Sequence, residues 1–141
     1  MRSAVLILCV ALSGCGRHAL PLRKDQLAAV SRAVAACTDA SGALTPYLRR
    51  QDRAGADNAA IAARNLCSSS RAEIVAAIGT GTMLDACYFS VDRQEAVQRA
   101  ELADLDMPTL ATGQAVARLL DDAIRQQAGC ATALDTAARG S

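Results

Sequence analysis

In this 141-residue sequence, the cysteines are the first candidates for metal binding or thiol chemistry. The four in the body of the chain are Cys37, Cys67, Cys87 and Cys130. None of the four forms the C-x-x-C spacing that is typical of zinc sites, and the single histidine, His18, lies near the start of the sequence. We therefore predict neither a metal site nor a cofactor.

Paired carboxylates are the next candidates, because two acidic groups in one pocket can carry general acid and base catalysis. The closest pairs in sequence are Asp104 with Asp106 and Asp121 with Asp122. Acidic pairs of this kind usually lie on the solvated face of a helix or at its start. The turn Gly79-Thr80-Gly81 lacks the lysine of a phosphate-binding P-loop, and we interpret it as a helix stop. The sequence therefore favours a protein that is not an enzyme.

The start of the sequence has the layout of a secretory signal, with a charged residue, an apolar run and then small residues. Arg2 precedes the apolar run over residues 4–12, and small residues come directly before Cys15. A membrane-spanning helix needs about 20 apolar residues, and this run is shorter. We therefore predict a cleaved signal peptide over residues 1–14 rather than a transmembrane helix.

The four residues Leu12-Ser13-Gly14-Cys15 resemble the lipobox of bacterial lipoproteins. The resemblance implies cleavage before Cys15 and attachment of fatty acyl chains such as palmitate, which would anchor the protein to a membrane. Gly16 follows where an aspartate would imply the inner membrane, so the resemblance implies the outer membrane, facing the periplasm. The alternative is ordinary secretion, with Cys15 left as a thiol. We identify no family for the rest of the chain.

Composition predicts an all-α fold beyond this segment. Alanine, which has the highest helix propensity, is abundant, and no segment alternates apolar and polar residues as a half-buried strand would. We predict a small disulfide-stapled bundle of about four helices plus a short connecting helix. Residues 15–24 would form the lipidated cysteine and tether, residues 25–130 the helical domain, and residues 131–141 a loose C-terminal tail.

Capping residues predict where the first helices begin and end. Asp25 is predicted to cap the first helix. The apolar stripe of that helix is Leu27, Val30, Val34 and Cys37. A second helix is predicted to begin at Thr45-Pro46, and Gly55 to interrupt it. The sequence Ser70-Arg71-Ala72-Glu73 is typical of a capping box and predicts the start of a short helix that Gly79 ends.

Two longer helices are predicted to follow, from about Leu84 to Leu105 and from Pro108 to Gly129. The buried side of the last helix is expected to carry Leu119, Leu120 and Ile124. A short turn joins the two helices, so they should form an antiparallel hairpin.

This hairpin also predicts how the cysteines pair. Four cysteines remain once those of the signal and the lipidated position are set aside, and an even number in an oxidising compartment predicts two disulfides. Free thiols in the core are the alternative. Cys87 and Cys130 lie at similar distances from the turn, so both fall near the same end of the hairpin. The geometry predicts a Cys87–Cys130 disulfide and, by elimination, Cys37–Cys67.

Charge is unevenly distributed along the sequence, although the net charge is only +1. Residues 17–71 contain nine basic and four acidic side chains, whereas residues 72–141 contain five and ten. The favoured interpretation is that the two halves pack against each other. The alternative is that the basic half faces anionic lipid headgroups. A net charge near zero predicts no nucleic-acid partner.

Two features are candidate interaction surfaces. One is the basic cluster Arg49, Arg50 and Arg53, and the other is Phe89, which is adjacent to Tyr88 and so points in a different direction. The poor catalytic inventory favours a lipid-anchored, non-enzymatic module that binds an envelope protein of unknown identity. Alternatives are a carrier of a small apolar ligand or lipid and, less favoured, a carboxylate-dependent hydrolase of a cell-wall polymer.

Overall fold

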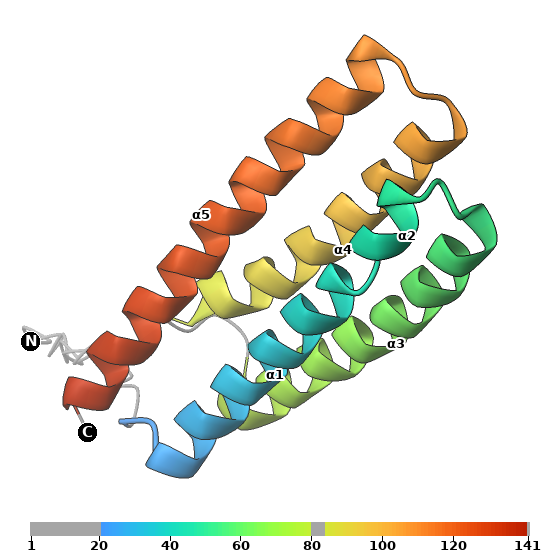
Figure 1. Cartoon of the computed structure of the whole chain (residues 1–141). Coiled ribbons are helices and arrows are strands. Elements are labelled where there is room, and N and C mark those ends of the chain that lie inside the picture. Colours follow the sequence, from blue (N-terminus) through green and yellow to red (C-terminus); the bar gives the residue numbers. More distant parts are fainter. Residues whose placement is uncertain (1–20, 80–83, 141) are drawn as a thin grey trace, which may run out of the picture.

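The computed structural model describes residues 21–79 and 84–140. Five helices and no strand lie in these two ranges (Figure 1). They are α1 (Lys24–Gly42), α2 (Thr45–Arg49), α3 (Arg53–Ile78), α4 (Asp85–Asp106) and α5 (Leu110–Gly140). The predicted all-α bundle of four long helices with one short connecting helix is confirmed. Among the described residues, no helix combines the length and the hydropathy of a membrane span.

Two helical hairpins make up the bundle (Figure 1). α1 and α3 are antiparallel and are joined through α2, while α4 and α5 form the second hairpin. α4 lies against both α1 and α3, whereas α5 packs mainly on α4. The start of α1 and the end of α5 consequently lie at the same end of the molecule.

The core lies where α1, α3 and α4 meet. The predicted apolar stripe of α1 is buried as expected: Leu27, Val30, Val34 and Cys37. Facing it in the same cluster are Cys67, Ile74, Leu84, Cys87 and Val91. Small side chains line a second cluster, in which Ala60 and Ala63 pack around Leu44. Leu44 follows the end of α1, so this cluster packs the α1–α2 connection against α3.

Both predicted disulfides are present. Cys37 and Cys67 join α1 to α3 with an S–S distance of 1.98 Å, and Cys87 and Cys130 join α4 to α5 with 2.01 Å. All four cysteines are at most 2% exposed. An alanine-rich core buries little apolar area per residue, so bridges worth about 2–4 kcal/mol each are an important part of the stability.

The second predicted helix is interrupted at a different point from the one that the sequence predicted. Gly55 does not interrupt a helix but lies in the first turn of α3, where its N–H donates to Oδ1 of the capping Asp52 over 2.9 Å. The chain breaks instead at Gln51, whose φ of 54° is in the left-handed region. The short connecting helix is α2, which ends before Gln51, and not the segment from Ser70 to Gly79 that was predicted to be short.

The predicted helix start at Ser70 is also wrong, because α3 runs through this residue without interruption. Ser70 is buried in phase with Cys67 and Ile74, on the stripe that faces the core. Packing of this continuous stripe outweighs the local capping preference, since tertiary contacts supply most helix stability. The predicted stop at Gly79 is confirmed, and its φ of 73° ends the helix.

α5 is longer than predicted. It continues past Gly129 to Gly140, so the prediction of a loose tail over residues 131–141 is wrong for the part that the structure describes. Leu134 and Ala137 pack against the core cluster and hold the last turns of the helix in place. A single glycine costs a helix only about 1 kcal/mol, and this packing compensates for it.

Ion pairs cross between the basic and acidic halves of the sequence. Arg71 on α3 lies 3.3 Å from Asp92 and 2.8 Å from Glu95 on α4. Arg53, at the start of α3, lies 3.1 Å from Asp106 at the end of α4. These contacts support the interpretation that the charge asymmetry serves packing within the molecule.

Candidate interaction surface

In the part of the chain that the structure describes, the cysteines form structural disulfides. Cys15, the predicted lipidation site, lies outside the described residues. The other four cysteines that the sequence singled out are buried in disulfides, so they offer no thiol to a substrate. Residues 21–79 and 84–140 contain no group of three or more His, Cys, Asp or Glu side chains arranged to hold a metal ion.

The first predicted carboxylate pair is used within the bundle. Asp104 accepts a hydrogen bond from the hydroxyl of Thr112 across the α4–α5 hairpin. Asp106 forms its ion pair with Arg53 of α3. The two carboxylates therefore bind different helices and do not share a pocket.

The second carboxylate pair is divided in the same way. Asp122 lies 2.7 Å from Arg93 of α4 and is partly covered. Asp121 is exposed and has no ion pair with any described residue. Because neighbours on a helix point in different directions, these two side chains do not form an acid–base pair.

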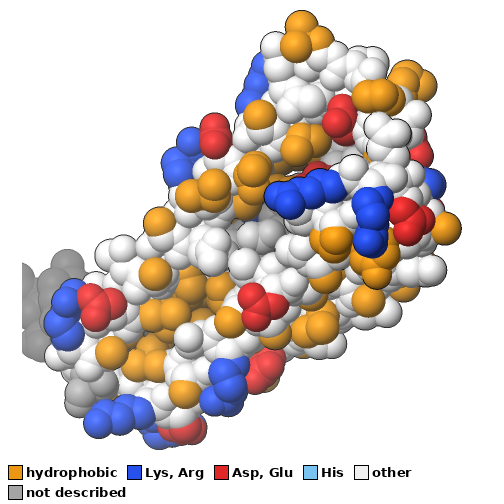
Figure 2. All heavy atoms as spheres, viewed as in Figure 1, with side chains coloured by type: hydrophobic (Ala, Val, Ile, Leu, Met, Phe, Trp, Pro, Cys, Tyr) orange, Lys and Arg blue, Asp and Glu red, His pale blue; other side chains and the backbone are white. Residues whose placement is uncertain are grey.

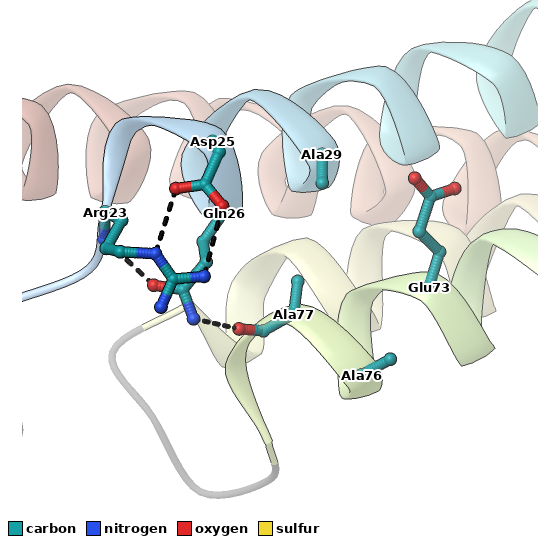
Figure 3. A pocket seen from close by; sticks show the side chains of 7 residues that line it. All are labelled: Arg23, Asp25, Gln26, Ala29, Glu73, Ala76 and Ala77. Atoms are coloured by element: carbon teal, nitrogen blue, oxygen red, sulfur yellow. Dashed lines mark hydrogen bonds and ion pairs between the residues drawn. The ribbon is translucent and has the colours of Figure 1, made fainter.

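A hollow of about 310 Å³ lies between the start of α1 and the end of α3 (Figure 3). Three of its four polar side chains bind one another or the backbone, and the fourth is Glu73. Arg23 pairs with Asp25 at 3.1 Å and lowers the pKa of that carboxyl by hydrogen bonding, and Gln26 Nε2 donates to the carbonyl of Ala77 over 2.7 Å. The Arg23 N–H donates to Gln26 Oε1 over 2.9 Å, so Arg23 and Gln26, rather than the predicted Asp25, cap α1. The hollow therefore lies where the Arg23–Gln26 cap of α1 contacts the end of α3.

The three arginines of the predicted basic cluster have different surroundings. Arg53 is paired with Asp106 and donates from Nη1 to the carbonyl of Leu102, so its charge is used in joining α3 to α4. The Arg50 guanidinium lies 5.3 Å from the centre of the Tyr47 ring. Arg49 is exposed in the last turn of α2. Arg49 and Arg50 thus form a basic corner at α2.

Phe89 on α4 is 49% exposed. Its ring meets that of Tyr88 edge to face, with 5.9 Å between the centroids. Tyr88 packs against the core cluster, whereas the adjacent Phe89 faces solvent.

α5 carries two neighbouring stripes of side chains, each with the alternating three- and four-residue spacing of a heptad. The stripe that faces α4 is buried or half-buried: Thr112, Val116, Leu119, Ala123, Gln126, Cys130, Ala133 and Ala137. The second stripe is exposed at every position: Leu110, Gly113, Ala117, Leu120, Ile124, Gln127 and Ala131. We refer to this second set as the open stripe.

The open stripe exposes large apolar side chains. Leu110 is 80% exposed, Ile124 56% and Leu120 44%. The next residue in the same register, Leu134, packs against the core, so the bundle covers only one end of this face. Figure 2 shows hydrophobic side chains along α5 and a surface that is hollowed between α5 and the α1–α2 side. Contiguous exposed apolar surface of this kind marks interaction sites.

The prediction that Leu119, Leu120 and Ile124 all lie on the buried side of α5 is wrong for the last two. Which face of α5 is buried is set by Cys130, because its disulfide ties that position to α4. Counting back from Cys130 by seven residues selects Ala123, which is buried, and not Ile124. The predicted disulfide was therefore the signal that identifies the correct face.

The sequence matches no protein-family model, no curated protein and no solved structure. The candidate surface is accordingly defined by the geometry of this chain alone. It consists of the open stripe of α5, with the basic corner of α2 across the hollowed surface between α5 and the α1–α2 side (Figure 2).

Proposed function

We propose that this protein is a lipid-anchored, non-enzymatic module of the bacterial cell envelope that acts by binding a protein through the open stripe of α5. The observation that carries the proposal is the exposure of a complete heptad face with Leu120 and Ile124 at its centre. Heptad faces are normally covered by another helix, so the partner of this face is expected to be helical.

The lipobox resemblance of residues 12–15 supports the anchor and, through Gly16, the periplasmic side of the outer membrane. Acyl chains on Cys15 would hold the helical domain close to the membrane. The two disulfides suit an oxidising compartment such as the periplasm.

The anchor is tested by the intact mass of the protein recovered from bacterial membranes, with and without reduction and alkylation. The expected mass is that of a chain that begins at Cys15 and carries acyl groups, with four further cysteines alkylated only after reduction. A chain without acyl groups would contradict the anchor.

Binding through α5 is tested by photocrosslinking in cells. A photoreactive amino acid at Leu120 is expected to give protein adducts, because this position lies in the open stripe. The matched control is Ile61 on α3, which is 49% exposed but lies outside the stripe. Equal adduct yields at both positions would contradict the proposed surface.

A further inference from the structure

We propose that the open stripe of α5 is covered by α5 of a second copy of this chain, in antiparallel orientation. This inference rests on the function proposed above, because it names the occupant of the same face. Two-fold symmetric dimers are the commonest oligomers, and both copies contribute the same surface to the interface. A helix face suits such an interface only if it is complementary to itself. The open stripe meets this condition in its packing and in its charge.

The packing is self-complementary about a two-fold axis near residue 122. With this axis Leu120 of one copy faces Ile124 of the other, and the symmetric contact repeats the pair. The same register places Gly113 opposite Ala131 of the second copy. These small side chains flank the apolar centre and allow the two helices to approach closely. Two large side chains on each copy, 44% and 56% exposed, are thereby removed from water.

The charges beside the stripe are complementary in the same register. Asp121 and Arg125 lie on one flank of α5, one residue after Leu120 and Ile124. Asp121 has no ion pair with the described residues, and Arg125 is 71% exposed, with one contact of 3.4 Å to Asp122. In the antiparallel pair, Asp121 lies about two residues, or about 3 Å along the axis, from Arg125 of the second copy. The symmetry produces two such ion pairs.

The antiparallel arrangement also fixes how an anchored dimer meets a membrane. The start of α1 lies at the same end of the molecule as the end of α5 (Figure 1). In the antiparallel dimer the two α1 starts therefore lie at opposite ends. α5 has 31 residues and is about 46 Å long. Residues 15–23 can extend by at most about 30 Å. Both anchors therefore reach one membrane when α5 lies along its surface.

The dimer is tested with the full-length chain, expressed in cells as two copies with different tags. A photoreactive amino acid at Leu120 is expected to give an adduct of twice the chain mass that carries both tags. An adduct that joins Leu120 only to a different protein would overturn the second copy while supporting the proposed function. A yield at Leu120 no greater than that at Ile61 would overturn both.

Charge reversal tests the antiparallel register. Asp121→Arg and Arg125→Asp are each expected to lower the yield of the two-tag adduct about tenfold, because each reversal replaces two attractions by two repulsions. The two changes combined in one chain restore the opposite charges and are expected to recover the wild-type yield. A double variant as weak as the single variants would overturn this register.

A matched pair of isoleucines tests the apolar contact. Ile124→Asn is expected to lower the two-tag adduct at least about fivefold, because it places an amide at the centre of the interface. Ile61→Asn, on α3, changes a side chain of similar exposure outside the open stripe and is expected to leave the yield unchanged. Equal losses in the two variants would overturn the proposal.

Discussion

Gly55 lies in the first turn of α3, directly against the ring of Tyr47. A Cβ added at this position would lie 2.2 Å from Tyr47 Cδ1 and 2.5 Å from Asp52 Oδ2. Neither distance is tolerable, so Gly55→Ala must displace both the ring that closes the α2–α3 corner and the carboxylate that caps α3. We expect this substitution to lower the free energy of unfolding by about 1–3 kcal/mol.

Chemical denaturation of the purified protein measures this effect. Gly42→Ala is the control, because a Cβ at Gly42 meets no atom within 4 Å and the residue is helical. This variant is expected to gain up to about 1 kcal/mol from the reduced backbone entropy of the unfolded chain. A Gly55→Ala protein as stable as Gly42→Ala would show that the α2–α3 corner is not closely packed.

The half-buried Glu101 on α4 is expected to make the folding stability depend on pH. Burial raises the pKa of this carboxyl above its usual range, because removal from water disfavours the charged form. The folded protein therefore retains the Glu101 proton to higher pH than the unfolded chain does. It follows that ionisation of Glu101 lowers stability as the pH rises from the ordinary glutamate pKa through the raised value.

Glu101→Gln removes this ionisation, so the variant is expected to melt at a higher temperature than the wild type at pH 7. The difference should shrink below about pH 4, where the carboxyl is protonated in both states. Thermal melts of both proteins at the two pH values measure it. A gain of equal size at both values would mean that the amide improves packing and that ionisation is not the cause.

Among the contacts between elements, the pairing of Arg71 with Glu95 gives the next prediction. The Glu95 side chain is only 10% exposed, and Arg71 supplies its closest cation at 2.8 Å. Arg71→Met leaves this carboxylate in the α3–α4 contact without that partner. We expect a loss of about 2–3 kcal/mol in the free energy of unfolding, somewhat less than for a fully buried pair.

The double variant Arg71→Met with Glu95→Met is expected to recover most of that loss, because no buried charge remains. Arg139→Met is the control, since Arg139 and Asp135 are paired at 2.7 Å but are both more than half exposed. It should cost less than about 1 kcal/mol. A loss in Arg71→Met no larger than in this control would argue that α4 does not depend on the buried pair.

The sequence could predict the features that depend on local spacing, but not those that depend on packing between helices. The stripe of α1 follows from spacing, because spacing fixes which residues share a helix face. The Cys87–Cys130 pair follows from the similar distances of the two cysteines from the hairpin turn, and Cys37–Cys67 follows by elimination. The continuity of α3 through Ser70 does not follow from local signals, since it depends on packing against α1. The exposure of Leu120 likewise depends on which face of α5 meets α4, and an apolar residue does not reveal by itself whether another helix covers it.

At the scale of the whole molecule, the two hairpins are stabilised to different extents. α1, α3 and α4 share the core of large side chains, whereas α5 meets α4 through a stripe that includes Ala123, Ala133 and Ala137. Short side chains bury little apolar area, so the Cys87–Cys130 bridge carries a large share of the attachment of α5. We therefore expect α5, which carries the open stripe, to depend more on its disulfide than the other helices do.

Replacing each bridge by two alanines tests this difference. The bridges span 30 and 43 residues, and chain entropy alone predicts a loss of about 4 kcal/mol for either one. The distribution of the loss should differ, because local opening follows local packing. With Cys87→Ala and Cys130→Ala, we expect amide hydrogen exchange to accelerate first in α5, while α1 and α3 remain protected.

With Cys37→Ala and Cys67→Ala, the two helices still share large core side chains such as Val30 and Ile74. Exchange is then expected to accelerate together in α1, α3 and α4, because these helices unfold as one unit. Similar exchange patterns in the two variants would contradict the division of the bundle into a core and an attached α5. A selective loss in α5 would also predict that reduction of Cys87–Cys130 abolishes binding through the open stripe before the rest of the bundle unfolds.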